Sequence, residues 1–307
     1  MTDAASPRWR GEPGRLEVWY ATATDIATGM GLWLHYELVA PTAGDPYVHG
    51  WAATFPRLRS PSVVRFGPHP AEPAHPEWLR APSFAIGPGR LTGAVNEAQW
   101  DLAWDSDQPP IWTLGEASWR RELLPSSQVV VAPKARLSGR LRVGAARYAV
   151  DAVGNLAHIY GHGNAQRWGW LHADLDDTTT LEIVTAVGRR PALRGLAPMA
   201  FVQLRRNGKD WPRNPLLAAP VLRTSFGDTE WSVRGVIGTH RLTVTVSQPS
   251  DRCVHLDYTD PDGAEAICAN TEVADVNVRL ERWKGLWKVE QEWSLERGAH
   301  AERGYRD

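Results

Sequence analysis

The chain has 307 residues, enough for one large domain or for two of about 150 residues each. Its composition, 43% hydrophobic and 22% charged, is typical of a globular protein. With a formal net charge of −1 and a pI near 6.8, the chain has no excess of positive charge that would favour nucleic acid or an acidic membrane as a partner.

No segment predicts a secretory signal or a membrane span. The first residues, M-T-D-A-A-S-P-R-W-R, contain no apolar stretch, and no apolar run reaches the roughly 18 residues of a spanning helix. We therefore expect a cytoplasmic protein without an integral membrane segment. Cys253 and Cys268 flank a turn signal, T-D-P-D-G, so either they lie close across a hairpin or they are two reduced thiols.

Alternation of apolar and polar residues predicts β-strands along the whole chain, while helical periodicity is nearly absent. In chain order, the first half contains the predicted strands 15–22, 32–38, 89–95, 98–105 and 136–143. The second half contains 146–152, 156–161, 168–175, 180–187, 199–205, 231–237, 241–247, 253–259, 265–271, 276–282 and 287–293. Many short strands separated by turn signals indicate antiparallel sandwiches or barrels.

Two of these strands nearly repeat each other. W-L-H-Y-E-L at 33–38 and W-L-H-A-D-L at 170–175 both place a Trp, a His and an acid at every second position. Their separation is about the length of one small barrel domain. We therefore expect two β domains of similar plan, residues 1–136 and 137–307.

The segment 158–175 carries the densest set of chemically active side chains. Its even-numbered residues are aromatic, amide or ionisable: His158, Tyr160, His162, Asn164, Gln166, Trp168, Trp170, His172 and Asp174. Its odd-numbered residues are glycine or aliphatic except for Arg167. Because successive side chains of a strand point to opposite faces, a hairpin turning at G-N-A-Q would gather the even-numbered residues on one surface.

The chain has 16 Trp against 5 Phe and 7 Tyr, an excess that suits either the wall of a ligand cavity or plugs that fill a barrel. Burying Trp168 and Trp170 is worth about 1.5–3 kcal/mol each. We expect their face to line an enclosed cavity, which is the usual form of a small-molecule site. The alternative is a satisfied structural network of His, Asn and Trp that joins the two domains.

The first copy of the repeat places Trp33, His35 and Glu37 on one face, with Trp51 on the following strand. These residues either contribute to a binding site or form a structural pair at a barrel rim. Near the end of the chain, His300 and Glu302 share a face if extended, and with Asn270 they lie either near the second barrel's cavity or at a surface strand end.

Metal and cofactor motifs are absent from the sequence. The three histidines of the 158–175 segment lie in strands, without an H-E-x-x-H motif or a cysteine cluster, so no metal site is predicted. The chain also contains no nucleophile elbow, P-loop or dinucleotide-binding fingerprint.

At these same residues the chain resembles a known family. G-L-W-L-H-Y-E-L-V-A-P, H-G-W-A-A-T-F-P, Q-W-D-L-A-W-D and G-H-G-N…R-W-G-W-L-H-A-D-L are similar to segments of the hydroxyneurosporene-synthase-like (carotenoid 1,2-hydratase-like) double-lipocalin proteins. Tocopherol cyclase and lipocalin-like Diels–Alderases are more distant members. The resemblance covers roughly residues 15–305. It implies an all-β fold of two lipocalin-like antiparallel β-barrel or barrel-sandwich domains side by side.

The resemblance also implies cofactor-free chemistry on a hydrophobic isoprenoid or polyketide: cyclisation, hydration or cycloaddition. Such a reaction needs a placed acid or hydrogen-bond donor and aromatic walls that stabilise a cation. The predicted catalytic residues are Tyr160, His162, Asn164 and His172. The predicted substrate-binding residues are Trp33, His35, Trp51, His158, Trp168, Trp170 and Asp174. The alternatives are a non-catalytic carrier of a hydrophobic small molecule and a purely structural or partner-binding protein.

Overall fold

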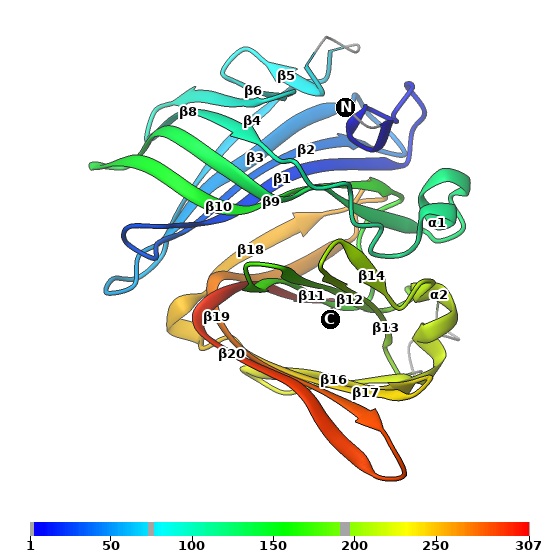
Figure 1. Ribbon diagram of the computed structural model, residues 1–307. Coiled ribbons are helices and arrows are strands. Elements are labelled where there is room, and N and C mark those ends of the chain that lie inside the picture. Colours follow the sequence, from blue (N-terminus) through cyan, green and yellow to red (C-terminus); the bar gives the residue numbers. More distant parts are fainter. Residues whose placement is uncertain (1–2, 73–76, 191–196, 307) are drawn as a thin grey trace. The chain divides into compact units, whose positions relative to one another are not determined.

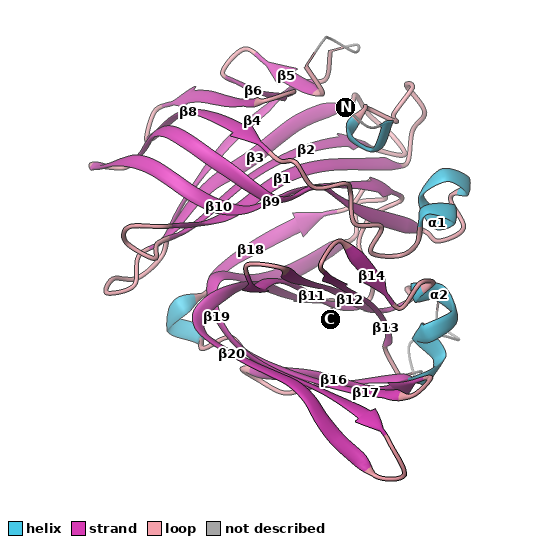
Figure 2. Cartoon of the chain, viewed as in Figure 1, coloured by secondary structure: helices cyan, strands magenta, loops and turns pink. Residues whose placement is uncertain are grey.

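The computed structural model describes residues 3–72, 77–190 and 197–306. Strands make up 65% of the structure and helices 6%, and the strands form two large antiparallel sheets, one of them a nearly closed barrel (Figure 2). The prediction of an all-β, lipocalin-like fold is confirmed. The helical segments are short: η1 (Asp3–Ala5), α1 (Glu116–Arg121), α2 (Pro215–Ala218), η3 (Ala219–Val221) and η4 (Ser250–Arg252).

The first sheet has ten strands in the order β4-β3-β2-β1-β10-β9-β8-β7-β6-β5 (Figure 1). The strands are β1 (Arg15–Asp25), β2 (Gly31–Ala40), β3 (Tyr47–Phe55), β4 (Ser62–Pro70), β5 (Leu79–Ala81), β6 (Phe84–Gly87), β7 (Arg90–Val95), β8 (Ala98–Asp105), β9 (Ser126–Val143) and β10 (Ala146–Gly161). Strands that follow each other in the chain pair, except β4 and β5, which lie at the two ends of this order, and β10 also pairs with β1.

The second sheet has the order β14-β13-β12-β11-β20-β19-β17-β16-β15, with β18 paired to β19. The strands are β11 (Arg167–Asp176), β12 (Thr179–Val187), β13 (Met199–Arg206), β14 (Lys209–Trp211), β15 (Leu222–Phe226), β16 (Glu230–Ile237), β17 (His240–Ser247), β18 (Val254–Thr259), β19 (Glu265–Trp283) and β20 (Trp287–Tyr305). As in the first sheet, the last strand pairs with the first, here β20 with β11.

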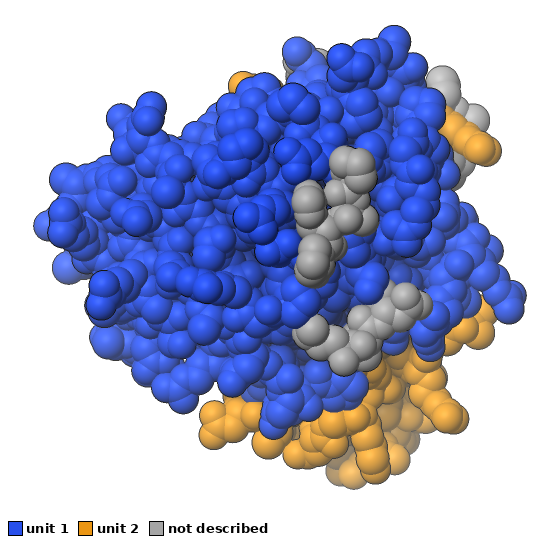
Figure 3. Space-filling view, turned by 90° about the horizontal axis from the view of Figure 1, so that it is seen from above, with its two compact units in different colours: residues 1–112, 116–164, 258–265 blue, residues 113–115, 165–257, 266–307 orange. Residues whose placement is uncertain are grey.

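The chain forms two compact units, coloured separately in Figure 3. Unit 1 comprises residues 1–112, 116–164 and 258–265, and unit 2 comprises residues 113–115, 165–257 and 266–307. The expected division after residue 136 falls within β9, which pairs on both sides inside the first sheet. β10 also belongs to that sheet, so the first change of unit along this part of the chain comes after residue 164.

The two copies of the repeat occupy different places in their sheets. W-L-H-Y-E-L lies in β2, which pairs with β1 and β3. W-L-H-A-D-L lies in β11, which pairs with the last strand of its sheet as β1 does. The repeat therefore reflects a shared strand pattern and does not mark equivalent strands of the two units.

The interior of unit 1 is rich in aromatic rings. Leu34 and Tyr36 of β2 face this core, where the Trp100 indole donates a hydrogen bond to the Tyr36 hydroxyl at 2.7 Å. Phe66 and Phe84 pack beside them with ring centroids 4.5 Å apart. Several tryptophans thus fill the barrel as plugs, one of the two roles expected from their number.

The interior of unit 2 is largely aliphatic. It is built from the odd-numbered residues of β11, including Leu171 and Leu175, and from inward-facing residues of the other strands, with Trp231 as one large ring. Cys253 and Cys268 are both free and buried. Within residues 3–72, 77–190 and 197–306, no helix has the length and apolar character needed to cross a membrane.

Candidate functional site

The predicted hairpin between 158–162 and 168–172 does not form. β10 pairs with β1 and β9 in the first sheet, and β11 pairs with β12 and β20 in the second. The even-numbered residues of the segment are therefore divided between the two units. The expectation that they share one surface was wrong, because each strand finds its partners far away in the chain.

His158 points into the interior of unit 1. Its Nδ1 lies 2.8 Å from the carbonyl oxygen of Ala4, and its Nε2 lies 2.9 Å from a carboxylate oxygen of Glu17. Its ring stacks on Trp19 with centroids 4.5 Å apart. With both nitrogens hydrogen-bonded and the side chain fully buried, His158 fits the alternative of a satisfied structural network.

Tyr160 also faces the interior of unit 1. Its hydroxyl donates a 2.5 Å hydrogen bond to Glu12, and the guanidinium groups of Arg8 and Arg15 lie 4.9 and 5.3 Å from its ring centre. Burial and the neighbouring Glu12 carboxylate raise the pKa of Tyr160. The hydroxyl is thus held as a donor to Glu12.

His162 and Asn164 follow β10 and also have local partners. His162 is exposed, with Nε2 2.8 Å from a guanidinium nitrogen of Arg15 and Nδ1 3.1 Å from the carbonyl oxygen of Gly14. Asn164 donates from its backbone and side-chain nitrogens to the Asp260 carboxylate. The catalytic roles predicted for Tyr160, His162 and Asn164 stay predictions, since each has a structural contact of its own.

A first group of buried rings and ionisable side chains lies on the face of β2 and β3 opposite the core of unit 1. We call it the unit 1 aromatic–histidine cluster, and its members are Trp33, His35, Glu37, His49, Trp51 and Tyr258. The alternation of β2 directs its odd-numbered side chains to this face. The structure therefore brings Trp33, His35 and Glu37 of the first copy of the repeat together with Trp51 of the following strand.

His35 is the centre of this cluster. Its ring stacks on Trp51 with centroids 3.9 Å apart, and Trp51 stacks in turn on Tyr258 at 5.4 Å. His35 Nε2 donates to the Glu37 carboxylate at 2.9 Å, and His49 lies 3.6 Å from the other Glu37 oxygen. His35 and Glu37 form the expected pair, and both are buried.

Burial and hydrogen bonding set the charges of this pair. Loss of hydration lowers the pKa of His35 and outweighs the attraction of Glu37. Burial by itself would raise the pKa of Glu37, but hydrogen bonds from His35 and His49 outweigh it and lower that pKa to about 2. His35 is therefore a neutral imidazole beside the charged carboxylate of Glu37. Its Nδ1 makes no hydrogen bond with any residue that the structure describes.

A second buried group lies on the face of the second sheet opposite its aliphatic core. We call it the unit 2 acid–histidine cluster, and its members are His172, Glu182, Glu272, His300 and Glu302. β11, β12, β19 and β20 supply them. The odd-numbered side chains of β11 fill the barrel interior, so the predicted orientation of its histidine–tryptophan face toward an interior cavity was wrong.

The distances within the unit 2 acid–histidine cluster are short. His172 Nδ1 lies 2.8 Å from Glu182, which also accepts the indole N–H of Trp170 at 2.7 Å. His300 Nδ1 lies 2.5 Å from Glu272, and the two imidazole rings are 6.0 Å apart.

Two further predicted residues border this cluster. Trp168 donates its indole N–H to Glu302 at 2.6 Å. Asp174 lies 3.9 Å from His172 Nε2 and accepts a hydrogen bond from Thr180. The predicted residues Trp168, Trp170, His172 and Asp174 therefore lie around one acidic site, although not inside the barrel.

The pKa values of His172, Glu272 and Glu302 are all raised, but the cause differs between the histidine and the acids. Burial alone would lower the pKa of His172, but Asp174 and Glu182 outweigh it and raise that pKa to about 9. Burial raises the pKa of Glu272 despite its contact with His300. Burial likewise raises the pKa of Glu302 despite its hydrogen bonds. A buried imidazolium thus stands beside carboxyl groups that hold protons more tightly than exposed ones.

Three buried polar groups at this cluster lack a hydrogen bond of good geometry among the described residues. They are Oε1 of Glu272, Nε2 of His172 and the side-chain amide of Asn270. Buried polar groups are normally paired, and leaving one unpaired costs about 1–3 kcal/mol. A bound molecule or water at this place could supply the hydrogen bonds that these atoms lack.

Sequence reasoning missed two of the three acids of this cluster, Glu182 and Glu272. They sit among apolar residues of two strands and carry no motif. A tight turn pairing Asp176 with Thr179 would by itself place His172 opposite Ile183; an irregularity between Asp174 and Asp176 shifts the register by one residue and brings Glu182 opposite His172. His300 and Asn270 are buried and Glu302 is half-buried, so of the two placements left open for them the surface strand end was wrong.

The described residues contain no group of three or more His, Cys, Asp and Glu side chains that could hold a metal ion. In the unit 2 acid–histidine cluster the carboxylates contact histidines and indoles instead of converging on a common point. The chemistry available to these groups is therefore proton transfer and hydrogen bonding.

Comparison with known proteins gives close relatives and a shared fold. Uncharacterised proteins of two Mycobacterium tuberculosis strains, MT0513 and Rv0493c, are 50% identical over 305 residues, covering 99% of this chain and 90% of theirs. Kievitone hydratase from Nectria haematococca superposes with a TM-score of 0.63 at 10% identity, over 99% of this chain and 91% of that one. CghA with Sch210972 gives 0.65 at 11% identity, over 100% and 96%.

These two structures share the lipocalin-like double-barrel fold found here. The sequence itself matches the model of one family, described as tocopherol cyclase-like, over residues 14–304. The resemblance noted from the Trp- and Gly-rich segments is thereby confirmed, and the chain belongs to the tocopherol cyclase-like family.

Proposed function

We propose that the chain is a cofactor-independent enzyme that acts on a hydrophobic isoprenoid or polyketide by cyclisation, hydration or cycloaddition. The family match and the fold shared with a hydratase and with CghA, a Diels–Alderase, support an enzyme of this general kind. Within this range, the structure favours a reaction started by proton transfer.

The observation that carries the proposal is the unit 2 acid–histidine cluster. An alkene is a weak base, so protonating one of its carbons requires a carboxylic acid in its protonated form, shielded from water. Burial raises the pKa of Glu272 and of Glu302, which favours the protonated form of each carboxyl group. The unpaired Oε1 of Glu272 is an oxygen from which a proton could be delivered.

Each residue then has a distinct role. Glu272 is the proposed acid, and His300 is a positioning residue that holds its second oxygen. His172 stays charged between Glu182 and Asp174 and offsets part of their negative charge. The site is bordered by Trp168 and Trp170, whose rings can stabilise cationic character in a substrate.

Trp33, His35 and Trp51 remain predicted substrate-binding residues of unit 1. Their face is apolar and aromatic, with Trp33 and Trp51 in edge-to-face contact at 5.2 Å, as expected for a surface that meets a polyene or prenyl chain. Proton transfer by Glu272 does not depend on them.

Activity profiling with Glu272→Gln tests the proposal. The full chain, freed of small molecules, is incubated with an organic extract of cells of its own source that lack the gene, and products are followed by mass spectrometry. We expect one compound to be consumed and an isomer, or a product heavier by one water, to form without added cofactor. The rate should fall at least about 100-fold in Glu272→Gln, in line with the loss of a general acid.

Glu281→Gln is the matched control, because it also removes a buried carboxylate from β19, but one that is paired with Arg241 and lies outside the unit 2 acid–histidine cluster. The control should keep most of the activity. A compound that is bound and released unchanged would point to the carrier alternative and contradict the proposal. Full activity in Glu272→Gln would remove the assignment of the acid.

A further inference from the structure

The turn between β19 and β20 carries exposed apolar side chains. Trp283, Leu286 and Val289 are 48%, 57% and 45% exposed. The two tryptophans that close the turn, Trp283 and Trp287, pair across the strands with ring centroids 5.3 Å apart. We call residues 282–289 the hairpin tip; it lies at the end of the orange and red hairpin in Figure 1.

Basic residues are interleaved with these apolar ones. Lys284 and Lys288 are exposed and make no ion pair or side-chain hydrogen bond with any residue that the structure describes. Arg282 is also exposed. The two acids that flank the tip in the chain are already paired, Glu281 with Arg241 and Glu290 with Arg206. Glu290 also lies 3.4 Å from His240. The hairpin tip therefore presents apolar and positively charged groups together, with its flanking acids neutralised.

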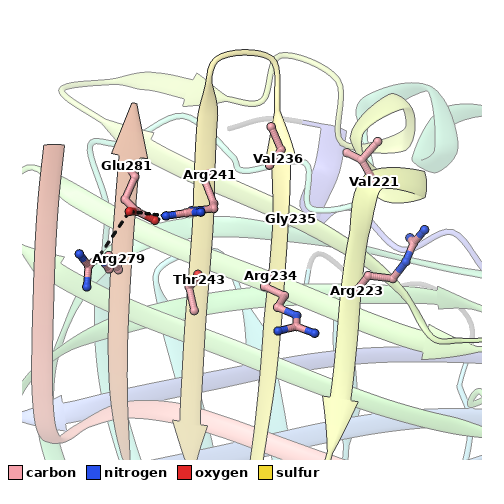
Figure 4. A pocket seen from close by; sticks show the side chains of 9 residues that line it. All are labelled: Val221, Arg223, Arg234, Gly235, Val236, Arg241, Thr243, Arg279 and Glu281. Carbon is pink, nitrogen blue, oxygen red and sulfur yellow. Dashed lines mark hydrogen bonds and ion pairs between the residues drawn. The ribbon is translucent and has the colours of Figure 1, made fainter. Parts of the chain in front are cut away.

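The outer face of the adjoining strands extends this positive surface. Arginine side chains from β15, β16, β17 and β19 line an open hollow of about 810 Å³ (Figure 4). They are Arg223, Arg234, Arg241 and Arg279, and the acid of this lining, Glu281, accepts two short hydrogen bonds from Arg241.

This arginine face is continuous with the hairpin tip. The Arg241 guanidinium lies 4.9 Å from the centre of the Trp287 ring. Arg279 lies 3.4 Å from Glu292 of β20. The acids beside the arginine face are thus in ion pairs with arginines, as are the acids that flank the tip. The whole chain has a net charge of −1, and this positive surface is therefore a local feature.

We infer that the hairpin tip, with the arginine face beside it, docks on the surface of an anionic lipid bilayer. Tryptophan is enriched at bilayer interfaces, where its ring is buried among the headgroups and its N–H stays hydrated. Basic residues near an anionic surface each contribute about a fivefold gain in binding. A soluble anion would account for the arginines but not for the exposed Trp283 and Leu286. This docking goes beyond the proposed enzymatic function and does not require it.

Vesicle sedimentation of the full chain tests this inference. Vesicles of equal parts phosphatidylcholine and phosphatidylglycerol are compared with vesicles of phosphatidylcholine alone, at low and at high salt. The wild-type chain should sediment with the anionic vesicles at low salt and much less with the neutral ones. Trp283→Ser combined with Leu286→Ser should weaken binding at least about tenfold, since both side chains lose burial in the interface. Lys284→Glu combined with Lys288→Glu should weaken it at least about 30-fold.

Two matched controls lie far from the hairpin tip in sequence. Leu58→Ser removes another apolar side chain, 97% exposed, and Lys209→Glu reverses another exposed lysine. Both should bind like the wild type, and circular dichroism checks the fold of every variant. Absence of binding to anionic vesicles, or tip variants that bind as the controls do, would overturn the inference. Self-association of the chain that is lost in the tip variants, without vesicle binding, would identify a second copy as the occupant and would also overturn it.

Discussion

At the scale of single residues, two histidines of similar sequence context carry different charges. His35 and His172 both follow W-L, and each has an acid two residues later in the chain. His35 meets one carboxylate in a stack of rings, and burial lowers its pKa. His172 meets two carboxylates, which raise its pKa to about 9. The partner from the neighbouring strand, Glu182, makes the difference.

The raised pKa of His172 predicts a pH dependence of stability. A histidine that binds its proton more tightly when folded contributes stability fully below its unfolded pKa of 6.5, and this stability is lost as the pH rises through about 9. Urea unfolding between these limits should show the free energy of unfolding decreasing by a few kcal/mol, on the order given by 1.4 kcal/mol per pKa unit.

The His172→Gln variant isolates this contribution. In this variant the free energy of unfolding should no longer decrease in this pH range because of residue 172. His255 is exposed, and His255→Gln should show the same decrease as the wild type. If the slope between pH 6.5 and about 9 is the same in His172→Gln as in the wild type, the charged state assigned to His172 is wrong.

The sequence predicted some of these residues and not others. The aromatic and histidine residues of β11 were evident because they alternate along one strand. Glu272 was not, because a single acid in an apolar strand has no local signature and becomes meaningful only when β19 pairs with β20. Site residues contributed by a neighbouring strand depend on pairing, and pairing depends on contacts distant in the chain.

At the scale of elements, tryptophans lie over glycines of neighbouring strands. Trp168 stands opposite Gly304, and a Cβ atom built on Gly304 would lie 1.9 Å from the Trp168 ring. Gly93 and Trp100 repeat the arrangement in unit 1, with a distance of 2.0 Å. In both cases the missing side chain makes room for the ring on the sheet surface.

Gly304→Ala should therefore displace Trp168 and its hydrogen bond to Glu302. We expect a loss of stability of about 1–3 kcal/mol, as for overpacking elsewhere, measured by thermal or urea unfolding. Gly298→Ala on the same strand is the control, because its added Cβ would meet its nearest neighbour at an ordinary 3.4 Å. Equal stability of the two variants would show that the ring does not depend on Gly304.

Strand positions could be predicted from alternation, because each strand buries one face in its own core. The hairpin predicted at G-N-A-Q could not be tested by alternation, since a two-strand hairpin and two strands in separate sheets give the same pattern. The chain passes from one sheet to the other at this point, where Asn164 is held by Asp260 from a distant segment.

At the scale of the whole molecule, the sequence predicted two lipocalin-like β units but not where the chain divides between them. The first and last strands of each sheet pair, β1 with β10 and β11 with β20, so each unit needs its last strand to be complete. The length of the chain gives the number of units, whereas the division after residue 164 follows from this pairing.

The central claim is that the unit 2 acid–histidine cluster gives a proton to a hydrophobic substrate. The most direct test is to run the extract incubation in deuterated water and to locate the deuterium in the product by mass spectrometry and NMR. We expect one deuterium on a carbon of the wild-type product and no formation of this product by Glu272→Gln. A product that forms at the wild-type rate with no deuterium on carbon would contradict this claim.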